Sequence, residues 1–186
     1  MNILALDLGT QTGWALSVPN RLGGGDLVDV GTFRTATPKE ITAWGKTRMT
    51  RRADPRIQRL NNFVVGIHSK IRLDWILFED VTFASSQFQT QMWASLRAAI
   101  WLTGSACPNV GFPQFECCPV TTLKKFSTGK PGAKKEDMAK ALVMVDPRFR
   151  LDGSKVIDQT NGQTIDDNAV DALLLLKWGK VILKNL

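Results

Sequence analysis

The sequence contains one histidine, His68, and only three cysteines, Cys107, Cys117 and Cys118. Two of the cysteines are adjacent and no Cys-x-x-Cys pair occurs, so neither a zinc finger nor a Cys/His zinc site is expected. An odd number of cysteines with this spacing also argues against a disulfide framework. We therefore expect reduced, buried thiols in a cytoplasmic protein, and we place His68 on the exposed surface of a helix.

Long apolar segments are also missing. The longest runs, such as Ala172–Leu176, are far shorter than a membrane span. The chain starts with an apolar strand that ends in an acid, and a basic segment with a cleavage site is not seen. We expect a protein without a membrane partner or a targeting segment, which stays where it is made.

Composition points to one globular domain with a basic surface. The chain has 186 residues, of which 44% are hydrophobic and 22% charged, as in ordinary folded domains. The 24 Lys and Arg outnumber the 17 Asp and Glu, so the net charge is +7 at pH 7. A basic balance of this size favours a polyanionic partner such as nucleic acid.

Hydrophobic patterning indicates an α/β domain. Short apolar runs predict strands at 2–8, 14–18, 28–33, 75–78 and 114–118. Apolar residues spaced by three and four predict helices at 55–72, 87–104, 134–145 and 166–183. A lysine-rich connector is expected at 119–135 and a loop at 146–163. This order predicts a mixed sheet with helices on its faces, in a single domain spanning 1–186.

Several acids lie at positions that surface solvation does not explain. Asp7 and Glu79 each follow an apolar run at the end of a strand, where open sheets collect their ligands. Asp166, Asp167 and Asp171 open the last predicted helix. Asp167 and Asp171 share one face because they are four residues apart. Capping of the helix is the alternative role for Asp166, but Asp171 lies beyond the first turn.

Carboxylates that converge on one point repel each other unless a cation joins them. Oxygen ligands suit Mg²⁺ or Mn²⁺, and two such ions about 4 Å apart clamp the attacking and leaving oxygens of a phosphoryl transfer. In a basic protein, lysines and arginines would hold a nucleic-acid backbone while the acids hold the metals. The pattern therefore predicts a metal-dependent nuclease.

Three motifs, taken in order, resemble the RuvC-like Holliday junction resolvases. They are DLGTQTGWA at 7–15, Glu79 after an apolar strand, and DNAVDAL at 167–173. The stretch TGKPGAKKEDM at 128–138 is similar to the phage-encoded branch of that family in particular. The resemblance spans essentially the whole chain, and it would place the protein in the cytoplasm of a phage's host cell.

The resemblance implies an α/β, RNase H-like fold, with a mixed central sheet of about five strands flanked by helices. It implies a homodimer that makes paired nicks in opposed strands of a four-way DNA junction, with two Mg²⁺ ions per site or Mn²⁺ in their place. The implied catalytic residues and metal ligands are Asp7, Glu79, Asp167 and Asp171. Cellular members carry an Asp or His where this chain has Asn168, so Asp167 is the favoured fourth ligand and Asn168 is the alternative.

Two basic segments are candidates for DNA contact. The connector before the third helix contributes Lys124, Lys125, Lys130, Lys134 and Lys135, of which Lys125, Lys130 and Lys134 carry the most weight. A second run contains Arg51, Arg52, Arg56 and Arg59, opposed only by Asp54. Solvated surface is the alternative for both. Related resolvases place an aromatic wedge after the strand-ending Glu, which makes Phe83 a candidate, with ordinary packing as its alternative.

The helix predicted at 87–104 carries a wide apolar face, formed by Met92, Trp93, Leu96, Ile100 and Trp101. A stripe of this kind usually belongs to the core, and its width suggests a dimer contact as well. Two-fold symmetry would let two active sites face two symmetric strands.

Other functions compete with junction resolution. The first motif also resembles the phosphate-binding hairpin of actin-like ATPases and sugar kinases. That class needs two such domains around a nucleotide, so we expect no nucleotide cofactor here. A catalytically silent junction-binding protein, a ribonuclease H and a less selective branched-DNA debranching endonuclease would share this fold, since fold alone does not fix function.

Overall fold

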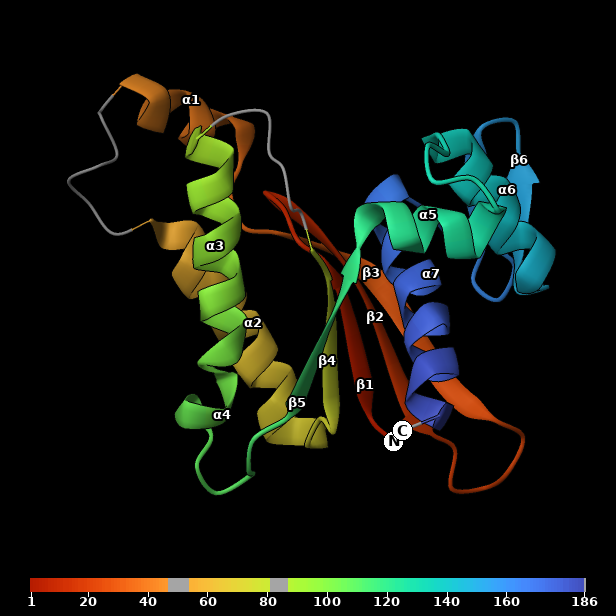
Figure 1. The fold of residues 1–186 in the computed structure, drawn as a ribbon, viewed down its shortest axis with the longest axis horizontal. Coiled ribbons are helices and arrows are strands. Elements are labelled where there is room, and N and C mark those ends of the chain that lie inside the picture. Colours follow the sequence, from red (N-terminus) through yellow and green to blue (C-terminus); the bar gives the residue numbers. More distant parts are fainter. Residues whose placement is uncertain (47–53, 81–86, 186) are drawn as a thin grey trace.

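A computed structural model describes residues 1–46, 54–80 and 87–185 (Figure 1). At its centre is a five-stranded mixed sheet with the order β3-β2-β1-β4-β5. Neighbours β1, β2 and β3 pair antiparallel, whereas β1, β4 and β5 run parallel. The strands are β1 (Ile3–Asp7), β2 (Gln11–Pro19), β3 (Asp26–Arg34), β4 (Trp75–Asp80) and β5 (Gln114–Pro119). The predicted mixed sheet is confirmed.

The middle of the sheet is covered on both faces. In β1, Ile3 and Leu4 face opposite sides of the sheet, yet their exposed fractions are 2% and 0%. A near-continuous apolar run is typical of a strand packed on both faces. The edge strand β3 instead mixes exposed and half-buried residues.

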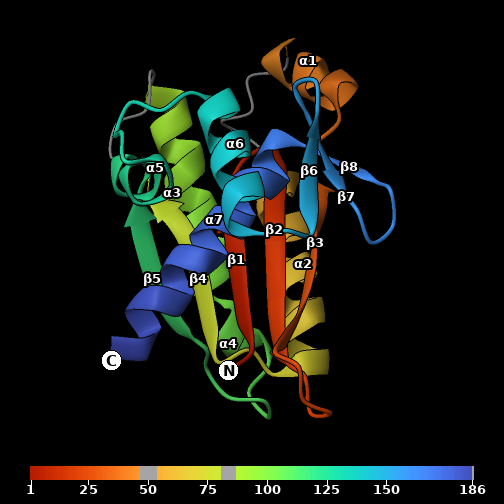
Figure 2. The same ribbon diagram turned by 90° about the vertical axis from the view of Figure 1, so that its right-hand side faces the viewer.

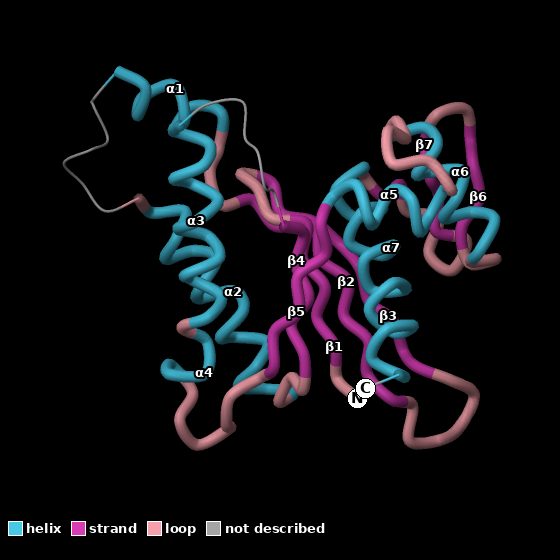
Figure 3. Tube along the Cα trace, in the orientation of Figure 1, coloured by secondary structure: helices cyan, strands magenta, loops and turns pink. Residues whose placement is uncertain are grey.

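Helices pack in a layer on each face of this sheet (Figures 1 and 3). One layer holds α2 (Pro55–Ile71), α3 (Gln87–Trp101) and α4 (Thr103–Ala106), with α1 (Pro38–Lys46) at its upper end. The other holds α5 (Val120–Thr128), α6 (Lys135–Val145) and α7 (Asp167–Ile182), which a single turn, η2 (Leu183–Asn185), follows. A small antiparallel sheet lies beside α6 (Figure 2), formed by β6 (Phe149–Asp152), β7 (Lys155–Asp158) and β8 (Thr164–Ile165).

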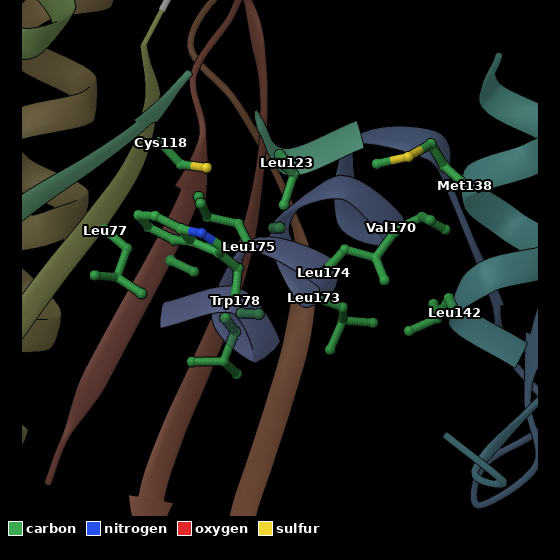
Figure 4. Packing of buried hydrophobic residues seen from close by; sticks show 14 of the residues in the cluster. Leu77, Cys118, Leu123, Met138, Leu142, Val170, Leu173, Leu174, Leu175 and Trp178 are labelled. Carbon is green, nitrogen blue, oxygen red and sulfur yellow. The ribbon is translucent and has the colours of Figure 1, made fainter. Parts of the chain in front are cut away.

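Helix α7 forms much of the core on its side of the sheet. Leu173, Leu174 and Leu175 are each at most 2% exposed, because they meet the sheet and the helices α5 and α6 from different sides of α7 (Figure 4). Gly179 lies so close to Leu77 in β4 that a methyl group there would collide with the leucine side chain. The helix therefore lies directly against the sheet, and its first turn is fixed relative to the strand ends.

Two predicted loops, and one segment for which no element was predicted, contain regular structure. The connector 119–135 contains α5, which ends at Gly129 in the left-handed conformation at φ 78°. The loop 146–163 contains the hairpin of β6 and β7, and the basic segment 34–55 contains α1. These elements are short, with nine residues in each helix and four in each strand, so each offers few apolar positions from which to recognise a pattern. The helix expected over 87–104 is divided into α3 and α4.

The prediction for His68 is wrong, because this residue is fully buried. Its Nε2 lies 2.9 Å from the carbonyl oxygen of Gly111, and Nδ1 accepts a hydrogen bond from the amide of Leu73 at 3.1 Å. The chain segments after α2 and α4 therefore close over the imidazole, and His68 ties them together. The thiol prediction holds for Cys107 and Cys118, whereas Cys117 is exposed on the edge strand β5.

Within the described ranges, we find no helix that is both long and apolar enough to cross a bilayer.

Candidate active site

Two acidic side chains lie side by side where the parallel strands β1 and β4 end. Leu6 is opposite Phe78 in the register of these strands, so Asp7 and Glu79 both follow at the same edge of the sheet. Parallel strands direct their carboxyl ends to one edge, which is where ligands bind in such sheets. Glu79 is only 8% exposed, so its carboxylate is buried against its neighbours.

A third acid comes from α7, whose first turn crosses β2 near the start of that strand. Gly13 in β2 allows this approach, because a side chain there would collide with the backbone of Asn168 and Ala169. Asp166 caps the helix by accepting a hydrogen bond from the amide of Ala169 at 3.0 Å. These contacts bring Asp171, one turn further along α7, close to the two strand acids.

The pKa shifts demonstrate that the three carboxylates interact. Burial, followed by repulsion from Glu79 and Asp171, raises the pKa of Asp7 well above its usual range. Burial and the charge of Asp171 raise the pKa of Glu79 to about 7. Burial also raises the pKa of Asp171 to about 6, with a contribution from Asp167. The site therefore concentrates negative charge in poorly solvated surroundings and attracts cations.

Two lysines supply the opposing charge. Lys124, in α5, lowers the pKa values of Glu79 and Asp171. Lys135, the first residue of α6, lowers those of Asp7 and Asp171. Both lysines were predicted to contact DNA, but Lys125, Lys130 and Lys134 were favoured over them. The structure differs because helix α5 was not predicted, and the turn of this helix directs Lys124 to the acids.

The two candidates for the fourth ligand lie differently. Asp167 is exposed and forms an ion pair with Lys135, with Nζ 3.0 Å from Oδ2. Asn168 is half-buried, and its backbone carbonyl faces Gly13. The structure also brings in Gln11, which donates a hydrogen bond to the carboxylate of Asp166. Sequence analysis missed Gln11, although its place in the first motif was a signal that could have found it.

The donor set has the chemistry that a hard divalent cation requires. Asp7, Glu79 and Asp171 offer only carboxylate oxygens, and their mutual repulsion falls when a cation joins them. Among the described residues, however, no three acidic, histidine or cysteine side chains enclose a metal-binding position as they stand. The residue types fit Mg²⁺ or Mn²⁺, and the carboxylates would have to draw closer to surround one.

The other predicted DNA contacts fall into two groups. Lys125, Lys130 and Lys134 are exposed on α5 and in the link to α6. Arg51, Arg52 and Phe83 lie outside the described residues.

Two arginines from the second basic run form ion pairs within the protein instead. Arg56 is 3% exposed and lies 2.5 Å from Asp54. Arg59 pairs with Glu40 of α1 at 2.6 Å and donates a hydrogen bond to the carbonyl of Thr35 at 2.9 Å. These contacts attach α1 and α2 to the sheet.

A mixed five-stranded sheet with acids at its parallel edge and on helix α7 is the arrangement of an RNase H-like fold. The Thermus thermophilus RuvC structure matches with a TM-score of 0.62 at 13% identity, over 98% of this chain and 96% of that one. The structure of T. thermophilus RuvC in complex with Holliday junction substrate matches with a TM-score of 0.63 at 16% identity, over 94% of this chain and 90% of that one.

The yeast mitochondrial Holliday junction resolvase Ydc2 matches at a TM-score of 0.54 and 12% identity, over 98% of this chain and 83% of that one. No protein-family model matches the chain, and comparison with curated proteins finds no match. The structural neighbours establish that the chain has the RuvC-type fold, which confirms the fold prediction.

Proposed function

We propose that this protein is a metal-dependent endonuclease that resolves four-way DNA junctions by paired, symmetric nicks. The observation that carries the proposal is the meeting of Asp7, Glu79 and Asp171 at one edge of a RuvC-type sheet, flanked by two lysines. A basic protein with one buried acidic site has the charge distribution that phosphodiester cleavage requires.

The resident cofactor in this proposal is a pair of Mg²⁺ ions, which Mn²⁺ can replace. Asp7, Glu79 and Asp171 would hold them, with Asp167 as the fourth ligand and Asn168 as the alternative. When bound, the ions supply an activated water and charge stabilisation for the leaving oxygen. The protein itself contributes the buried surroundings, which keep these carboxylates poorly solvated and close together.

Lys124 and Lys135 act on the DNA strand in this mechanism. Each carries a positive charge beside the acids, where a phosphate would approach. A fixed cation stabilises the charge that develops on a phosphate in the transition state. The more distant Lys125, Lys130 and Lys134 bind the flanking backbone, and they set affinity more than rate.

The proposed enzyme is a homodimer that uses the outer face of α3. Gln91, Ala94, Ala98 and Trp101 are exposed and follow one another at spacings of three, four and three, so they form one stripe. The small alanines allow close approach of a second helix, and Trp101 is 52% exposed. In contrast, Leu96 and Ile100 of the predicted apolar face are buried in the core.

The decisive experiment mixes the pure protein with a labelled four-way junction, with Mg²⁺ or with EDTA, beside a linear duplex and a Y-shaped substrate. The proposal expects paired nicks at the junction only with metal. Equal cutting of the Y-shaped substrate would favour a branched-DNA debranching enzyme. Tight binding without nicks in both Mg²⁺ and Mn²⁺ would favour a silent junction-binding protein, and it would direct attention to Asn168.

A further inference from the structure

A pocket of about 250 Å³ lies between the end of α5 and the outer side of α6, away from the three acids. Its lining combines two lysines, two hydroxyl side chains and an apolar floor, formed by Ser127, Thr128, Lys130, Asp137, Lys140, Ala141, Met144 and Val145. Nothing in the proposed function uses Ser127, Lys140 or Met144.

The charges of the lining favour an anion. Lys130 and Lys140 are both exposed at the pocket. The one acid, Asp137, is already engaged, because its carboxylate accepts a hydrogen bond from the amide of Lys134 at 3.0 Å and so caps α6. The pocket therefore presents a net positive charge to a ligand.

A buried hydroxyl adds a second signal. The Oγ of Ser127 is buried and has no hydrogen-bond partner within the described part of the chain. An unsatisfied buried polar group costs free energy, and a ligand that bonds to it recovers that free energy. Phosphate oxygens are strong acceptors that a serine hydroxyl and two lysines suit well.

The pocket also continues the active site along α5. Lys124 lies beside Glu79 and Asp171, whereas Thr128, four residues later on the same helix face, lines the pocket. Four residues of helix span about 6 Å. A strand that passes Lys124 therefore reaches the pocket close to the scissile phosphate (Figure 1 shows α5 joining the end of β5 to the region of α6).

We propose that the α5–α6 pocket binds a backbone phosphate of the cleaved strand, close to the scissile phosphate. Lys130, Lys140 and the Ser127 hydroxyl hold the phosphate, while Met144 and Val145 pack against the sugar. This inference rests on the proposed junction-resolving function, and it assigns to that function a contact outside the catalytic site. The inference gives a role to Lys140, which was not among the predicted DNA contacts: this lysine helps to position the DNA strand along the active site.

The test compares Lys140→Ala with Lys70→Ala, an exposed lysine near the end of α2 at the opposite end of the sheet. Junction affinity is measured in EDTA over a series of salt concentrations. Lys140→Ala is expected to weaken binding and to reduce the slope of log affinity against log salt by about one. Lys70→Ala is expected to leave both quantities at their wild-type values.

Phosphate-ethylation interference on the junction gives a second readout. The wild type should show interference at a phosphate of the cleaved strand beside the scissile one, and Lys140→Ala should lose that signal alone. Failure of the wild type to bind the junction would remove the proposed function. Wild-type binding with an unchanged slope and footprint in Lys140→Ala and in Ser127→Ala would overturn only the pocket assignment.

Discussion

The Nζ atom of Lys135 lies 3.0 Å from Oδ2 of Asp167, and the side chains of this pair are 70% and 56% exposed. Lys135 also lies close enough to Asp7 and Asp171 for those carboxylates, together with Asp167, to raise its pKa. Exposed ion pairs of this kind contribute little to stability. The pair can therefore separate at small cost, which would release Asp167 toward a metal ion and Lys135 toward a phosphate.

This relationship leads to a prediction about the fourth ligand. Asp167→Asn should weaken Mn²⁺ binding and lower junction cleavage, because it removes a carboxylate beside Asp171. Asn168→Ala should leave both close to wild type. Calorimetric titration with Mn²⁺ and single-turnover cleavage measure the two effects. Full activity and metal affinity in Asp167→Asn, with losses in Asn168→Ala, would transfer the role to Asn168.

The strand acids should be needed for cleavage and dispensable for DNA binding. Asp7→Asn and Glu79→Gln should each lower the cleavage rate at least about 10²-fold, a typical cost of removing one preorganised charged group. Junction affinity in EDTA should be retained. Glu136→Gln, at an exposed position of α6, is the matched control. Thermal unfolding in EDTA should show both site variants at least as stable as wild type, since each removes a repelling charge.

The close approach of β2 to α7 predicts a strong effect of one methyl group. Gly13→Ala would force α7 away from β2, and we expect a loss of about 1–3 kcal/mol in the free energy of unfolding. Cleavage should fall as well, because Asp171 moves with the helix. The control is Gly66→Ala in α2, where the space is open. That variant should gain about 0.5–1 kcal/mol, the usual advantage of alanine in a helix. Urea unfolding measures both changes.

The hairpin after α6 depends on a buried carboxylate. Asp158 is 1% exposed at its side chain and pairs with Arg148, which also donates a hydrogen bond to the carbonyl of Val28 in β3 at 2.5 Å. Burial by itself would raise the pKa of Asp158, but hydrogen bonds from Arg148 and Thr160 outweigh it and lower the pKa to about 2. The ionised form is therefore the one that the fold stabilises.

Asp158→Asn should accordingly cost about 3 kcal/mol at pH 7, since it leaves Arg148 without its partner. A lowered pKa in the folded state gives stability that is present above the unfolded pKa, near 3.9. That stability is lost as the pH falls toward 2. Chemical unfolding at pH 7 and near pH 2 should thus find a smaller gap between variant and wild type in acid. A gap that is constant with pH would contradict the ionic role.

The outer stripe of α3 predicts the oligomeric state. Ala98→Arg places a large charged side chain in the middle of that stripe and should convert a dimer to a monomer in analytical ultracentrifugation. Paired nicking should then become single, independent nicking. Ser69→Arg, at an exposed position near the end of α2, is the control. A wild-type protein that sediments as a monomer at assay concentrations would remove this surface from consideration.

Much of the sheet could be predicted from the sequence, because buried strands carry a simple signal. The run from Ile3 to Asp7 and the run from Trp75 to Phe78 that precedes Glu79 are apolar and short, and an acid closes each of them. The acids of the site were identifiable for the same reason. A carboxylate that follows such a strand is expensive to bury unless a ligand or partner compensates.

The missed features depend on contacts between distant segments. His68 is buried because Gly111 and Leu73 cover it, and neither residue marks that role in the sequence. The helix α5 has only nine residues, and only its position in the fold reveals which lysines face the acids. Arg56 and Arg59 belong to a basic run, but the acids that engage them include Glu40 from another helix.

The order in which the site's acids occur along the chain has a consequence for biosynthesis. Asp7 lies in β1 and Asp171 in α7, and α7 is also a large part of the core beneath the sheet. Chains emerge from the ribosome amino end first, so a nascent chain that has not reached α7 has neither this part of the core nor Asp171. The same helix then completes both the core and the proposed acidic site.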